Sequence, residues 1–111
     1  MSILKRRLNS IHLFNGDAKD FYGEWKRPTV IICDGPYGIS GYPGDLHTVE
    51  GLAEWYEEHI IKWNTHVTPK TTLWFWNTEL GWATVHPVLV KHGWEFKSCN
   101  IWDKGMSHVD C

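Results

Sequence analysis

The sequence is poor in the features that mark secreted, membrane and nucleic-acid-binding proteins. It has only three cysteines in 111 residues, without framework-like spacing, so we expect reduced thiols in a cytoplasmic protein. No apolar run approaches the length of a membrane span, and no apolar stretch follows the basic residues near the amino terminus as in a signal peptide. Cations are not in excess either: the formal net charge is -2, whereas a free-standing nucleic-acid binder is usually basic.

The remaining composition is that of one small globular domain. Hydrophobic residues make up 42% and charged residues 22%, which excludes wholesale disorder. Eight tryptophans are many for a chain of this length. Most of them are expected to fill the core, and the sharper alternative is that some lie at an interface or stack on bases.

The apolar pattern predicts alternating strands and helices. The β-branched run at 29–33 has no polar alternation, which is typical of a strand buried on both faces of a parallel sheet. Asp17 is placed to cap the first helix, Asn77 or Thr78 to cap the third and Gly93 to end it, whereas Pro87 should kink or split that third helix. The second helix has an apolar stripe that consists of Leu52, Trp55, Tyr56, His59, Ile60 and Trp63. The expected strands are 11–14, 29–33, 72–76 and 94–102, and the expected helices are 18–25, 48–65 and 78–92.

This order of elements predicts an α/β fold with a mostly parallel sheet flanked by helices. The pattern yields about four strands, whereas a doubly wound domain usually has about five or more. We therefore interpret residues 1–111 as a single domain with a partial, Rossmann-like sheet. Such a sheet has an unpaired edge, so we expect an N-terminal fragment that a complementary half or a second protomer completes.

Asp34 is the first candidate for a catalytic or ligand-binding residue. It follows a predicted buried strand and opens a glycine- and proline-rich loop at 35–45, the place where open α/β sheets bind ligands. The plainer alternative is an Asx-turn that Pro36 and Gly38 shape. Tyr37 favours the functional interpretation, because a turn does not require an aromatic ring there.

The four residues Asp34, Gly35, Pro36 and Tyr37 resemble the Asp/Asn/Ser-Pro-Pro-aromatic motif of amino-group DNA methyltransferases. These enzymes methylate N6 of adenine or N4 of cytosine. The resemblance implies that the Asp34 carboxylate and the Gly35 carbonyl accept the two N–H groups of a flipped base. Pro36 would stiffen the turn, and Tyr37 would stack on the base. An aspartate at the first position implies adenine, with cytosine as the alternative.

The surrounding segments agree with this resemblance, which spans most of residues 11–108. Residues 13–18 are similar to the Gly-Asp segment of members with a permuted motif order. Residues 72–79 and 101–105 resemble the strands that follow the motif in those members. The family implies double-stranded DNA as the partner and S-adenosylmethionine as the methyl donor.

The sequence departs from the family at two points. Gly35 stands where the family has proline, and glycine supplies the same carbonyl on a looser backbone. The family's Phe-x-Gly-x-Gly cofactor loop is absent, because the chain contains no Gly-x-Gly. Asp17 matches the acidic position near the adenine ring of S-adenosylmethionine, although a helix cap explains it equally well. In permuted members the cofactor loop and most DNA-contacting surface follow later, which implies a complementary C-terminal half.

A different class of function is a catalytically inactive, truncated methyltransferase-like module. Such a module would bind nucleic acid or a protein partner through its tryptophans and its open sheet edge, and the missing cofactor loop favours it. The basic clusters at 5–7 and 26–27 could touch phosphates, although short clusters on an acidic chain usually form a solvated surface.

A third interpretation is a small metal-dependent hydrolase that uses histidines. Only composition supports this interpretation. A metal could separately be bound by His108 and Cys111 together with Cys33 or Cys99. Their spacing matches no zinc pattern, so we predict no metal site.

Overall fold

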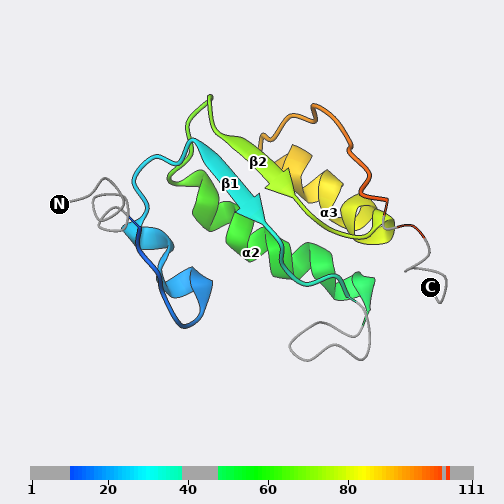
Figure 1. The fold of residues 1–111 in the computed structure, drawn as a ribbon. Coiled ribbons are helices and arrows are strands. Elements are labelled where there is room, and N and C mark those ends of the chain that lie inside the picture. Colours follow the sequence, from blue (N-terminus) through cyan, green and yellow to red (C-terminus); the bar gives the residue numbers. More distant parts are fainter. Residues whose placement is uncertain (1–10, 39–47, 104, 106–111) are drawn as a thin grey trace.

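The computed structural model describes residues 11–38, 48–103 and 105. Two helices lie on one face of a two-stranded sheet (Figure 1). Within the described part, no helix is long and apolar enough to cross a bilayer. The elements in chain order are the 3-10 turns η1 (Ala18–Asp20) and η2 (Tyr22–Glu24), strand β1 (Val30–Cys33), turn η3 (Val49–Gly51), helix α2 (Leu52–Asn64), strand β2 (Thr72–Phe75) and helix α3 (Glu79–Lys91).

The two strands pair in parallel, with Val30 opposite Thr72 and Cys33 opposite Phe75. A parallel pair needs a long crossover connection, and α2 lies in it. The prediction of an α/β class with a parallel sheet is therefore confirmed for the described residues. The larger Rossmann-like sheet goes beyond these two strands and stays a prediction.

The core lies between the sheet and the two helices. The buried stripe of α2 contributes Leu52, Tyr56, Ile60 and Trp63, as the helical spacing of its apolar residues requires. The inner face of the sheet contributes buried Ile31 and the half-buried side chains that alternate with the outer ones. The third contribution comes from α3, through Val85 and Leu89.

The outer face of the sheet is open, which contradicts the prediction that the run at 29–33 is buried on both faces. Val30, Ile32 and Trp74 point away from the helices, and Ile32 is 71% exposed. An apolar run without polar alternation indicates that both faces are suited to burial. Such a run does not show whether a second layer of helices is present to cover the outer face. In the described residues no helix covers this face.

Two predicted strands are not formed. Residues 11–14 and 94–102 are irregular, with Leu13 92% and Ile101 89% exposed. A strand requires a neighbouring strand to satisfy its backbone, and the described sheet ends at β1 on one side and at β2 on the other. The predicted helix at 18–25 is instead two successive 3-10 turns, and Gly23, a poor helix former, lies in the second of them.

The ends of α3 follow the sequence prediction closely. The Thr78 hydroxyl accepts a hydrogen bond from the Gly81 N–H (3.0 Å), which is an N-cap. At the other end Gly93 has a φ of 92°, its N–H bonds to Val90, and the next N–H bonds to Leu89 (2.9 Å), which is a Schellman motif. Pro87 does not split this helix, which continues unbroken from Glu79 to Lys91.

A buried histidine stands among the aromatic side chains of α2. His59 is 4% exposed, stacks on Trp55 with ring centroids 4.1 Å apart, and lies 2.8 Å from the Tyr22 hydroxyl through its Nδ1. Burial lowers the pKa of His59 from its usual 6.5. The folded protein therefore favours the neutral imidazole at this position.

This burial makes stability depend on pH. The unfolded chain binds the His59 proton more readily than the folded protein, so the stability is complete above about pH 6.5 and falls as the pH drops below that value. We expect the urea midpoint to decrease between about pH 7 and about pH 5, and His59→Gln to flatten that decrease. Tryptophan fluorescence during urea unfolding measures both. His66→Gln, at a less buried histidine, is the matched control, and an equal flattening by both variants would contradict the assignment to His59.

Candidate functional site

The loop after β1 leaves the sheet at its carboxyl end, next to the residues that follow β2. Because the strands are parallel, Asp34 and Asn77 emerge at the same edge of the sheet. Figure 1 shows the chain that leaves β1 running along α2 toward the start of that helix. The structure confirms that the Asp34 loop follows the carboxyl end of β1, and ligand binding at this end stays a prediction.

The carbonyl oxygen of Pro36 anchors this loop. It accepts a hydrogen bond from the Tyr56 hydroxyl (2.9 Å) and another from the Asn77 amide (3.0 Å). The same amide lies 3.4 Å from the Tyr56 hydroxyl, so the three groups form a closed triangle. We call this arrangement the Pro36 clamp. It joins the loop after β1, helix α2 and the residue after β2 through one oxygen atom.

Tyr56 is itself held rigidly. Its side chain is fully buried, and its ring lies edge-on to Phe75 of β2 and to Trp55. A buried tyrosine hydroxyl must find a hydrogen-bond partner, and the loop carbonyl meets that requirement. The clamp is therefore built on the core and not on the surface.

The clamp also explains the glycine at position 35. A Cβ atom on Gly35 would lie 2.5 Å from the Tyr56 hydroxyl oxygen and 3.2 Å from the Cζ of its ring. Real Cβ atoms do not approach another atom so closely, so neither proline nor alanine fits while Tyr56 holds its position. The backbone of Gly35 is not in the left-handed region, so space and not φ requires glycine here.

The side chains of Asp34 and Tyr37 meet at the surface of this loop. The Tyr37 hydroxyl donates a hydrogen bond to Oδ1 of the exposed Asp34 carboxylate (2.5 Å). Among described residues, the second oxygen of that carboxylate has no hydrogen-bond or ion-pair partner. The structure thus brings the side chains of Asp34 and Tyr37 together, in a contact that neither the functional nor the local-turn interpretation specified.

Asp17 does not join this group. Its carboxylate accepts a hydrogen bond from the Lys19 N–H (2.9 Å) and caps η1, which is the alternative role that the sequence offered. Lys19 in turn contacts Glu58 on α2 (3.2 Å). Figure 1 shows η1 and η2 apart from the loop that follows β1.

The cysteine and histidine side chains give no metal centre in the described residues. Burial raises the pKa of the Cys33 thiol to about 11, so this thiol stays protonated at neutral pH and is a poor ligand or nucleophile. His86 stacks on Trp82, with ring centroids 4.8 Å apart, and lies edge-on to Phe96. The other two candidate ligands, His108 and Cys111, lie outside the described residues.

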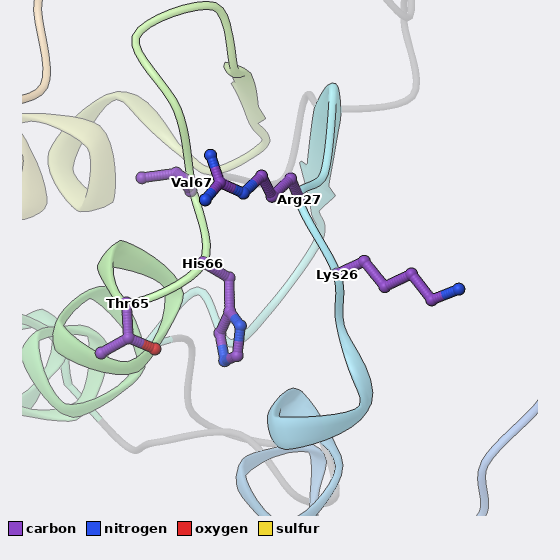
Figure 2. Close-up of a pocket in the computed structure, with 5 residues that line it drawn as sticks. All are labelled: Lys26, Arg27, Thr65, His66 and Val67. Atoms are coloured by element: carbon purple, nitrogen blue, oxygen red, sulfur yellow. The ribbon is translucent and has the colours of Figure 1, made fainter.

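Two surface hollows lie at the opposite, amino end of the strands. One is lined by Lys26, Arg27, Thr65, His66 and Val67, and Figure 2 shows that the Lys26 side chain points away from the other four. The second hollow shares Lys26 and Arg27 and continues along β1 to Ile32. Neither is lined by the Asp34 loop. Because the side chains of the first hollow do not converge, it does not have the geometry of a binding site.

Neither donor of the Pro36 clamp was predicted from the sequence as a site residue. Tyr56 was predictable only as part of the apolar stripe of a helix, and Asn77 only as a cap of the next helix. One chemical argument pointed to Tyr56, because a tyrosine hydroxyl on a buried helix face requires a hydrogen-bond partner. Which carbonyl would supply it depends on the contact between α2 and the loop, which lies 20 residues away in sequence.

Comparisons of this chain with protein-family models, with curated proteins and with solved structures returned no match. The functional assignment therefore depends on the residues and the geometry described above.

The packing at Gly35 predicts a coupled effect of two substitutions. We expect Gly35→Ala to lower the free energy of unfolding by about 1–3 kcal/mol, because its Cβ overlaps the Tyr56 hydroxyl. Tyr56→Phe removes a hydrogen bond worth about 1 kcal/mol but also removes the overlapping oxygen. The double variant should therefore be less destabilised than the sum of the single variants, as urea unfolding measures. Gly23→Ala, where a Cβ meets open space, is the control, and an equally small effect at Gly35 would contradict this account.

The buried thiol predicts selective alkylation. At about pH 8, we expect iodoacetamide to modify exposed Cys99 well before Cys33, because Cys33 holds almost no thiolate below its pKa of about 11. Peptide mass spectrometry over time separates the two sites. Denaturation in urea should make their rates similar, and similar rates in the folded protein would contradict the burial of Cys33.

Proposed function

We propose that this chain is the catalytic-motif half of an amino-group DNA methyltransferase that acts on an exocyclic amine, adenine N6 in preference to cytosine N4. The observation that carries the proposal is the placement of an exposed carboxylate and an aromatic ring, Asp34 and Tyr37, on a loop that the Pro36 clamp fixes at the carboxyl end of β1. The adenine preference comes from the resemblance alone.

The chemistry requires two fixed acceptors. The exocyclic amine of a base is a poor nucleophile, because its lone pair is delocalised into the ring. Two acceptors that hold its N–H groups favour a pyramidal nitrogen with a free lone pair. Asp34 supplies one acceptor oxygen, and the Gly35 carbonyl, which accepts no hydrogen bond among the described residues, is the second.

The Pro36 clamp supports this role by limiting the motion of the loop. Catalysis by orientation requires that acceptors already stand in position before the reaction. Family members gain stiffness from a proline at the position of Gly35. In this chain two hydrogen bonds to the next carbonyl hold the same backbone, so the substitution does not imply a loose loop.

Tyr37 has two roles in this proposal. Its hydroxyl orients the Asp34 carboxylate. Its ring would stack on an extruded base, as the resemblance implies. Stacking of a base on an aromatic ring is worth about 1–3 kcal/mol. Extruding a base from the duplex costs about a few kcal/mol, so stacking offsets a large part of that cost.

The described residues do not fit a binding site for S-adenosylmethionine. Asp17 is engaged as a cap away from the Asp34 loop, and the chain has no Gly-x-Gly. The chain's own contribution is to hold the base, and a complementary C-terminal half or a second protomer would supply the cofactor site and most of the DNA-contacting surface.

The second candidate is an inactive module that binds nucleic acid or a protein partner. The missing cofactor loop and the open, tryptophan-bearing face of the sheet favour it. Calorimetric titration of the isolated chain with S-adenosylmethionine distinguishes this module from a self-sufficient enzyme, because only the enzyme should bind the cofactor.

Reconstitution tests the methyltransferase proposal directly. The chain is mixed with a C-terminal half that carries the glycine-rich cofactor loop, and transfer of a labelled methyl group to double-stranded DNA is measured. We expect Asp34→Ala to slow the transfer by about a hundredfold or more, since it removes a preorganised partner of the reacting group. Tyr37→Phe should retain more activity than Tyr37→Ala, because it keeps the stacking ring.

Asp20→Ala, at another exposed carboxylate, is the matched control and should not change the rate. An active reconstituted protein whose rate is the same with Asp34→Ala would sink the catalytic assignment.

A further inference from the structure

The outer face of the sheet is a largely apolar surface, on which Thr72 is the one polar side chain of the two strands. We call it the open face and define it by Val30, Ile32, Trp74 and Trp76, together with Trp102, whose ring meets that of Trp76 edge-on at 5.9 Å. None of these side chains is ionisable. Parallel sheets are normally covered on both faces, and the described helices cover only the other one.

The open face is large enough to act as an interface. Trp74, Trp76 and Trp102 are 53%, 43% and 69% exposed. At about 250 Å² for a whole tryptophan side chain, these three leave about 400 Å² open, to which Val30 and Ile32 add. The largest apolar patch on a monomeric protein is about 300–600 Å², and a stable interface needs about 800 Å² on each partner, including its polar rim.

The charges around the open face have opposite signs at its two ends. Lys26 and Arg27 precede β1 at the amino end, where they border a hollow that continues to Val30 and Ile32. Asp34 follows β1 at the carboxyl end, and Asp103 follows Trp102. None of these four side chains makes an ion pair with a described residue.

We propose that two copies of this chain pack their open faces together about a two-fold axis, with the strands of one copy antiparallel to those of the other. This orientation places Lys26 and Arg27 of each copy at the end that carries Asp34 and Asp103 of its partner. The uncharged centre brings no like charges together, although each chain has a net charge of -2.

A second copy fits these observations better than nucleic acid does. A nucleic-acid surface needs cations distributed along the phosphates. The described residues place none in the centre of the open face, and Lys26 and Arg27 lie at its amino end. A second copy supplies an equal uncharged area and the opposite charge at each end. The proposal shares Asp34 with the methyltransferase proposal. Its tests substitute other residues and measure dimerisation, so the failure of one proposal can be told from the failure of the other.

Analytical ultracentrifugation of the whole chain over a range of concentrations tests the dimer. We expect a monomer–dimer equilibrium in which Ile32→Lys and Trp74→Lys each raise the dissociation constant by about tenfold or more, since each places a charge in the apolar centre. Leu80→Lys, at an exposed apolar residue of α3, is the matched control and should leave the constant unchanged. Circular dichroism confirms that each variant remains folded.

Charge reversal at the rim tests the orientation. Arg27→Glu and Asp103→Arg should each weaken the dimer severalfold, and the double variant should recover most of the loss, because it restores an attractive pair.

A wild-type chain that stays monomeric at the highest concentration would overturn the proposal. A dimer that survives both Ile32→Lys and Trp74→Lys would overturn it as well, since its interface would then lie elsewhere. Additive weakening by the two rim variants would overturn the antiparallel orientation.

Discussion

The hydrogen bond from the Tyr56 hydroxyl to the Pro36 carbonyl is the interaction on which the candidate site depends. The Tyr56 hydroxyl is attached to a buried side chain and needs a hydrogen-bond partner. The Pro36 carbonyl is that partner, so the bond fixes the loop that follows β1. Asn77 adds a second donor from the end of β2, so the loop is joined to both strands and to α2. The position of Asp34 relative to the sheet thus follows from core packing.

The sequence predicted the local structure of the described residues better than the packing between distant segments. The caps of α3, the glycine after it and the stripe of α2 depend on contacts within a few residues, and the structure confirms them. The strands at 11–14 and 94–102 were predicted from apolar residues alone, and they fail because strand formation depends on a neighbour that the pattern does not specify.

The candidate site shows the same division. The motif at 34–37 and its place at the end of a strand were readable from the sequence, and the structure brings Asp34 and Tyr37 together. The role of Gly35 was not readable, because it depends on a helix residue 21 positions later that occupies the space of a Cβ. The sequence offered two roles for Asp17, a helix cap and the acidic position near the adenine ring of S-adenosylmethionine. The three-dimensional structure shows that Asp17 caps η1.

The overlap between positions 35 and 56 has an evolutionary consequence. A related chain with proline at position 35 has to carry a residue without a hydroxyl group at position 56, or shift its helix away from the loop. The two positions should therefore vary together when homologous sequences are aligned. In one lineage the loop would then be stiffened by a proline at position 35, and in another by the hydrogen bond from a tyrosine at position 56.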